Sequence, residues 1–169
     1  RKAIEWQVKL VRKLEDKAED TYSEDDAVEL MNANMDLGGM ARNSEDYKLA
    51  EEAYAASYKL ASCLAFGAFG NNLFCKVKNL FKKYVTRTTR YEEAVKIMAQ
   101  ASRMMMELSY EIGVQEMIRE WTMKTEVIIR AIDKQFADAE TAVDLISISN
   151  LLARECLASG NISLSLIHI

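Results

Sequence analysis

Apolar residues recur every three or four positions along most of the 169-residue chain. This period matches an α-helix with one buried face, whereas a half-buried strand alternates with period two. The first stretch, IEWQVKLVRKLED (4–16), is ambiguous by itself, because its apolar residues fit both periods. The chain has no proline and only six glycines, so it lacks the turn residues that short strands require. We therefore predict an all-α fold, with the first stretch helical.

Glycines and capping residues predict where the helices end. The first helix is expected over 3–37, because Gly38 and Gly39 form a plausible C-terminal stop. Ser23 and Asp26 have capping-box spacing, so a break or a second start inside this helix is an open alternative. The other helices are expected over 45–90, 91–112, 114–132 and 141–157, with Gly113 between the third and the fourth.

The strongest pattern lies in the second predicted helix, whose N-cap is expected at Asn43 or Ser44. Positions spaced by four and three residues are all apolar or small, as in a coiled-coil seam. On this interpretation the two glycines of the seam allow a neighbouring helix to approach closely. The alternative is that AFGAFGNN (65–72) is a loop between two shorter helices. The expected assembly seam is Leu49, Ala53, Ala56, Leu60, Cys63, Gly67, Gly70, Phe74, Val77, Phe81 and Tyr84.

Charge is distributed unevenly, although the formal net charge is only −4. No acidic residue lies between Tyr54 and Tyr91, whereas acidic residues are dense over 15–26. The basic segment CKVKNLFKKYVTRTTR (75–90) suits an acidic lipid surface or RNA, although no RNA-binding motif accompanies it. It also suits an intramolecular partner, namely the acidic stretches at 15–26 and 133–144. A solvated helix face is the simplest alternative.

Residues that support catalysis or metal binding are scarce. The single histidine, His168, lies in LSLIHI (164–169), which is what a common sequencing adapter encodes and is expected to be non-native. Without histidine, no Ser-His-Asp, Cys-His, di-iron or histidine-containing zinc site can be assembled. No glycine-rich phosphate loop occurs, and the three cysteines form no CxxC pair. We therefore expect no enzyme, no metal and no cofactor, and a role in binding or assembly.

Several segments follow one another along the chain: EWQVKLVRKLE (5–15), KLAEEAYAASYKLASCLAFGAFGNNL (48–73), VKIMAQASRMMMEL (95–108), VQEMIREWTMKTEVI (114–128) and AIDKQFADAE (131–140). Their order resembles the ESCRT-III family, whose members polymerise on membranes and remodel them. The resemblance implies that 3–37 and 45–90 form a long antiparallel helical hairpin, with smaller helices from 91–140. We therefore expect three parts: an ESCRT-III-like core over 1–140, an amphipathic helix over 141–163 and the non-native tail over 164–169.

The function that this resemblance implies is that of a membrane-remodelling scaffold subunit in endosomal sorting and vesicle budding. Its implied partners are other ESCRT-III subunits or further copies in a filament, and an acidic membrane surface. The motif that recruits the disassembling AAA ATPase has no counterpart here, and nucleic acid is not an expected partner. No cleavable signal peptide and no apolar run of about 20 residues is visible, so we expect a cytoplasmic protein, peripheral on endosomal membranes.

The expected membrane-binding residues combine the first helix with the basic segment: Lys2, Trp6, Lys9, Arg12, Lys13, Lys76, Lys78, Lys82, Lys83, Arg87 and Arg90. The alternative function, from another class, is a helical-bundle or coiled-coil adaptor that binds proteins and ignores lipid. The geometry of the helices distinguishes the two. A long antiparallel pair favours the membrane scaffold, and helices of equal, shorter length favour the adaptor.

Overall fold

The computed structural model describes residues 2–21, 23–66, 90–131 and 139–158. Nearly all of these residues are helical and none is in a strand, which confirms the all-α prediction. The helices have similar lengths, between 17 and 22 residues. They are α1 (Lys2–Thr21), α2 (Glu24–Asn43), α3 (Tyr47–Phe66), α5 (Tyr91–Ile112), α6 (Gln115–Ala131) and α7 (Ala139–Ala158).

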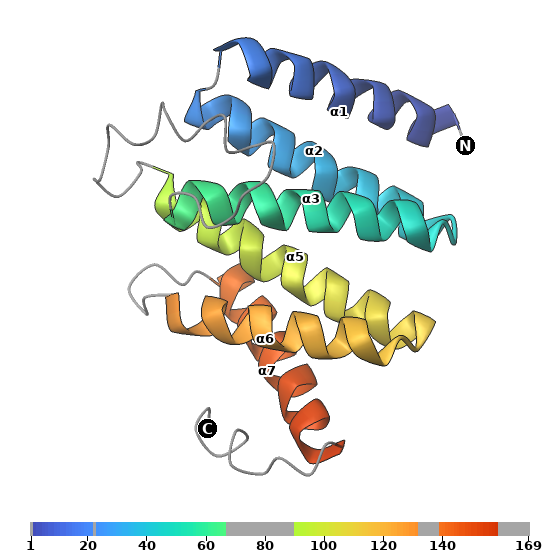
Figure 1. The fold of residues 1–169 in the computed structure, drawn as a ribbon, viewed down its shortest axis with the longest axis vertical. Helices are drawn as coiled ribbons and strands as arrows, with labels where there is room; N and C mark the ends of the chain where they lie inside the picture. The colour runs from blue at the N-terminus through green and yellow to red at the C-terminus, as the bar shows by residue number, and fades with distance from the viewer. Residues whose placement is uncertain (1, 22, 67–89, 132–138, 159–169) are drawn as a thin grey trace.

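Most of the described helices lie side by side in a row, in the order α1, α2, α3, α5 and α6, and each runs antiparallel to the one before it (Figure 1). α7 crosses the end of this row at a steep angle and packs on α5 and α6. Neighbours in the row make most of the contacts, and α1 contacts only α2 among the described helices. The described helices therefore form a layered array in which each helix packs mainly against the next, as in helical repeat proteins.

The single helix predicted over 3–37 is wrong, because two helices occupy this range. α1 ends at Thr21, and α2 begins at Glu24 and packs back along α1. Ser23 is the N-cap of α2: its backbone is extended, and its hydroxyl accepts a hydrogen bond from the Asp26 N–H at 3.1 Å. Three acids in the first turn of α2 favour this start through the helix dipole. The long first arm of the predicted hairpin is therefore absent.

Gly38 and Gly39 do not end α2 as predicted, because the helix continues to Asn43. Gly38 lies under the buried ring of Tyr54 from α3, and a Cβ added to Gly38 would lie 2.5 Å from two ring carbons. The missing side chain thus allows α2 and α3 to pack closely around Tyr54.

The turn between α2 and α3 is closed by backbone hydrogen bonds from Ser44, Glu45 and Asp46 to carbonyls of the last turn of α2. Glu45 adopts a left-handed conformation there, with φ of 61°. The Asp46 carboxylate accepts a hydrogen bond from the Leu49 N–H at 3.3 Å. Asp46, rather than Asn43 or Ser44, therefore supplies the side-chain cap at the start of α3.

α3 lies between α2 and α5, so its buried face is broader than the predicted seam. Ala53 and Leu60 of that seam are buried, whereas Leu49, Ala56 and Cys63 are half-buried. The other fully buried positions of α3 are Ala50, Tyr54, Ser57, Ala61 and Leu64. The remaining seam residues, Gly67, Gly70, Phe74, Val77, Phe81 and Tyr84, lie outside the described residues.

The last three predicted helices, over 91–112, 114–132 and 141–157, match α5, α6 and α7 closely. α5 has the predicted bounds, and Gly113 caps it in the left-handed conformation, with φ of 72° and its N–H bonded to the Ser109 carbonyl at 2.9 Å. α6 docks on the array through Trp121, whose ring meets Tyr58 of α3 edge-on at a centroid distance of 5.0 Å. None of the described helices combines the length and the apolar character that a membrane span requires.

Candidate interaction surfaces

The outer face of α1 is the first surface of interest. Val11 and Leu14 are buried against α2, and the Gln7 side chain donates a hydrogen bond to the Ala33 carbonyl of α2 at 2.9 Å. Trp6 and Leu10 lie away from this contact and are 72% and 43% exposed. Since α1 contacts no other described helix, this pair of large apolar side chains stays uncovered within the described part of the chain.

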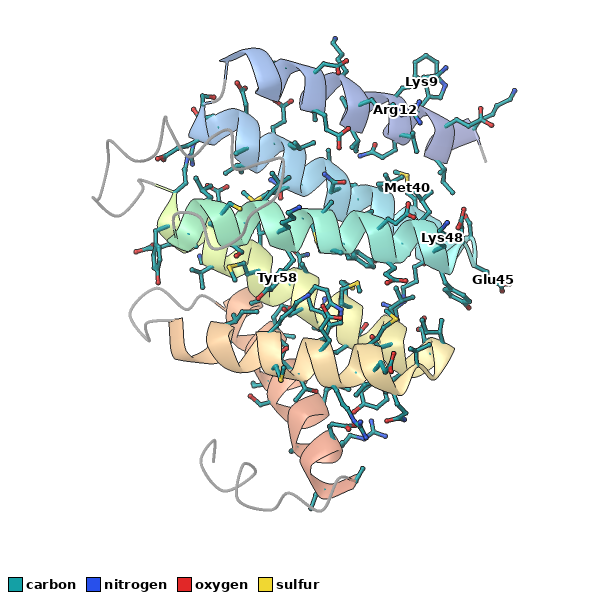
Figure 2. All side chains as sticks on the ribbon, viewed as in Figure 1. Lys9, Arg12, Met40, Glu45, Lys48 and Tyr58 are labelled. Carbon is teal, nitrogen blue, oxygen red and sulfur yellow. The ribbon has the colours of Figure 1, made fainter. Side chains whose placement is uncertain are left out.

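Exposed cations lie on the same helix as the two exposed apolar side chains, and one of them contacts Trp6. The Lys9 ammonium lies 5.2 Å from the centre of the Trp6 ring, a cation–π contact at the outer edge of the array (Figure 2). The α1 face, as we define it, consists of six exposed residues of α1, namely Lys2, Trp6, Lys9, Leu10, Arg12 and Lys13, and the acids Glu5 and Asp16 on the same helix are exposed as well. It contains every membrane-binding residue predicted on the first helix, so the structure brings these five predicted side chains onto one exposed helix.

The other predicted membrane-binding residues have different outcomes. Arg90, at the start of α5, pairs with Asp25 of α2 at 2.5 Å and with Glu93 at 2.9 Å. The hydrogen bond that Arg90 donates to the Asp25 carboxylate is the main cause of a raised pKa for Arg90. Arg90 therefore pairs with the acidic stretch 15–26, which agrees with the intramolecular alternative at this one residue of the basic segment. Lys76, Lys78, Lys82, Lys83 and Arg87 lie outside the described residues.

A network of ion pairs joins α2, α5 and α7, and it was not predicted from the sequence. Arg42 of α2 forms a two-point contact with Glu111, at 3.0 and 2.5 Å, and also pairs with Glu107 at 2.9 Å. Arg103 pairs with the same Glu107 at 3.4 Å and with the buried Asp144 of α7 at 2.6 Å. The hydrogen bond from Arg42 lowers the pKa of Glu111 below its ordinary value of 4.5. This network links three helices of the array.

The chemistry of the described residues offers no metal centre: no three His, Cys, Asp or Glu residues of the described part come together as ligands would. Burial raises the pKa of Tyr58 to about 12 and also raises that of Tyr54, so both phenols keep their protons at neutral pH. The Lys124 ammonium lies 4.0 Å from the centre of the Trp121 ring beside Tyr58. These groups serve the packing of α6 on α3.

The outer face of α7 is the second surface of interest. Its inner face packs on the array through Ile148 and Asp144, which are buried. Its outer face presents Val143, Ile146 and Leu157 to solvent. The sequence predicted this segment as amphipathic but not which of its apolar residues stay uncovered.

No protein-family model matches the chain, and no curated protein or solved structure matches it either. The case for a function therefore rests on the two exposed surfaces. The α1 face combines aromatic, aliphatic and cationic side chains, whereas the outer face of α7 is mainly aliphatic.

Proposed function

We propose that this chain is a helical scaffold that binds another protein, and that its α1 face receives an acidic amphipathic helix of the partner. The observation that carries the proposal is the exposure of Trp6, 72%, on a helix that packs against only one described neighbour. Tryptophan is among the residues that contribute most to binding energy at protein interfaces. Trp6 and Leu10 lie four residues apart, so they share one side of α1 and form the anchor of the site.

The array suggests how a partner helix would bind. Each helix of the row packs antiparallel on the preceding one, and α1 is the outermost helix of this row (Figure 1). A partner helix that packs on α1 would continue the row by one layer, with its apolar stripe on Trp6 and Leu10. Lys2, Lys9 and Lys13 would pair with acidic residues at the edges of that stripe, which sets the charge of the partner.

Helix lengths support an adaptor over a polymerising hairpin. Within the described residues the helices have 17 to 22 residues each, and α1 folds back on α2 instead of continuing into it. A filament built from long hairpins needs a first arm that spans both segments, and this arm is absent. The protein-binding alternative therefore becomes the leading proposal.

Photo-cross-linking tests the proposal. A photoreactive residue in place of Leu10 should link the full-length chain to an acidic polypeptide in cell extract, and K9E with K13E should lower the yield at least about tenfold. The matched control is K48E, since Lys48 is a largely exposed lysine on α3, away from the α1 face. Equal yields from the three proteins, or cross-links only to basic proteins, would contradict the proposal.

A second candidate function is peripheral binding to an acidic membrane, as the ESCRT-III resemblance implies. The exposed Trp6 beside Lys9 supports it, because a tryptophan flanked by cations suits the interface of an anionic bilayer. The exposed acids Glu5 and Asp16 on the same helix would oppose an anionic bilayer and an acidic partner helix alike, so they do not distinguish the two candidates. Co-sedimentation with phosphatidylserine vesicles at low salt distinguishes the two: salt-sensitive binding that W6A abolishes favours the membrane, and no binding favours the protein partner.

A further inference from the structure

α7 carries an exposed heptad seam. Residues 143, 146, 150, 153 and 157 follow the spacing three, four, three, four, which is that of a coiled-coil stripe. Val143, Ile146 and Leu157 are 58%, 62% and 67% exposed, Asn150 is also exposed, and Ala153 is half-buried. The array already occupies the opposite side of α7. α7 therefore has two packing stripes. One packs on the array, and the seam is the other, which no described residue covers.

The polar residue of the seam has a specific position. In heptad terms Val143, Asn150 and Leu157 take the a positions, and Ile146 and Ala153 take the d positions. A single asparagine at a central a position is the device by which parallel two-stranded coiled coils fix register and strand number, at a cost in stability. In a parallel pair each a residue meets its own copy, so two Asn150 amides can bond to each other. In an antiparallel pair a residues face d residues, which would leave Asn150 against Ile146 or Ala153.

We propose that α7 is a homodimerisation helix, and that a second copy of this chain pairs with it in parallel through Val143, Ile146, Asn150, Ala153 and Leu157. In this pair Asn150 donates to and accepts from Asn150 of the partner subunit. The described residues at the edges of the seam, Ser147, Ser149 and Arg154, include no acid, so no pair of like charges is forced together across it. The seam lies at the opposite end of the array from the α1 face, and this inference stands independently of the proposed function (Figure 1).

The choice of a second copy follows from the self-matching pattern. An in-register parallel pair places aliphatic layers at both ends and an amide layer in the middle, which satisfies the polar group as it enters the interface. An apolar occupant of another kind would leave the Asn150 amide without a partner. Two heptads are too short to associate as free peptides, because helix formation would oppose pairing.

α7 avoids this cost because the array holds it in place. Asp144 pairs with Arg103, and the Tyr110 hydroxyl lies within 3.5 Å of the Leu151 carbonyl and 3.4 Å of Glu155. The interface is nevertheless small, so a reversible dimer with Kd on the order of 10 μM is expected.

Sedimentation equilibrium of the full-length chain tests the proposal over concentrations on both sides of the expected Kd. The native chain should show a reversible monomer–dimer equilibrium, and I146D should weaken it by about 30-fold or more. M40D introduces the same charge at an exposed methionine of α2, outside both surfaces, and should leave the equilibrium unchanged. N150L should tighten association by about tenfold and allow larger assemblies, because the residue that limits strand number is gone. The tighter association expected of N150L keeps the test informative if I146D fails to fold.

Disulfide cross-linking tests the parallel orientation. V143C and L157C chains should each link to another copy of the same variant upon oxidation, with peptide mapping to separate these links from those of Cys63, Cys75 and Cys156. A dimer in which neither variant links to itself overturns the parallel pairing. A native chain that stays monomeric at every concentration, or a dimer weakened equally by M40D, overturns the proposal and leaves residues after 158 or a different protein as the occupant of the seam.

Discussion

α2 is joined to its two neighbours in the row, α3 and α1, by different means. Against α3, Gly38 lies under the buried ring of Tyr54, and the Ser57 hydroxyl donates to the Met31 carbonyl at 3.0 Å inside the interface. Against α1, the contact consists of an aliphatic strip and the partly exposed Gln7 hydrogen bond. The exposed ion pair between Lys17 and Asp26, at 2.6 Å, lies at the end of this interface where α1 stops and α2 begins. The first interface depends on close fit, and the second on a narrow apolar stripe.

The difference indicates where the array opens first. A helix with one neighbour and exposed polar contacts unfolds locally at a lower free energy than a helix packed on both sides. α1 is such a helix, and it also carries the α1 face. We therefore expect the binding surface to lie on the least firmly held of the first three helices, so that a bound partner stabilises α1 against local opening.

The largest effect is expected at the α2–α3 interface. G38A places a Cβ 2.5 Å from the Tyr54 ring carbons and should destabilise the protein by about 2–3 kcal/mol, although alanine is the better helix former. Gly39 is the matched control: its nearest contact would be the Tyr54 hydroxyl at 3.9 Å, so G39A should stabilise by about 0.5–1 kcal/mol. Urea unfolding measures both. Equal effects from the two variants would refute the close-fit interpretation.

A smaller effect is expected at the α1–α2 interface. L14A removes a buried side chain and should cost about 2 kcal/mol. Because α1 opens on its own, much of this loss should appear as faster hydrogen exchange of amides in α1, with little change in α3. Amide exchange followed by mass spectrometry distinguishes the two regions. Uniform acceleration across all described helices would show that α1 unfolds only with the whole array.

The N-cap of α2 should contribute less to the free energy of unfolding than either helix interface does. S23A removes the hydroxyl that accepts from the Asp26 N–H and should lower the free energy of unfolding by about 1 kcal/mol. S23D retains an acceptor beside the same N–H and is the control that should restore most of the loss. Chemical denaturation provides the measurement, and a loss that persists in S23D would point away from capping.

The smallest effect should come from the ion pair between Arg42 and Glu111. The pKa of Glu111 lies below 4.5 in the folded state, so its ionised form stabilises the fold above that pH. The contribution is lost as the pH falls through the lowered pKa. E111Q should cost about 1 kcal/mol or less at pH 7, because Glu111 is partly exposed and water screens the pair. The difference from the native protein should vanish in acid, and a difference that persists there would exclude the ion pair as its cause.

Some of this architecture is readable from the sequence and some is not. The bounds of α5 follow from the acids at its start and from Gly113 at its end, since both act on the local backbone. The break before α2 was visible only as the spacing of Ser23 and Asp26, and the apolar period continues across it. A periodic pattern alone cannot tell one long helix from two that fold back, because both bury the same stripe.

Other features depend on contacts distant in sequence. Gly38 looks like a helix stop, and only the ring of Tyr54 above it shows why glycine is needed inside α2. The pairing of Arg42 with Glu107 and Glu111 joins residues more than sixty positions apart, and charges of this kind occur all along the chain. The exposed cations of the α1 face were predicted individually. Their combination with Leu10 required knowledge of the side of α1 that α2 covers.

The short connection between α5 and α6 has a consequence for folding kinetics. Gly113 and Val114 are the two residues between these helices, and the backbone bonds from both return to the Ser109 carbonyl. α5 and α6 therefore meet without closing a long loop, and α1 and α2 do so across a similarly short joint. Structures rich in such near-neighbour contacts cross a low entropic barrier and fold quickly. We expect the two pairs to form within the first steps of folding, with the joining of α3 to α5 as the slower step that commits the chain.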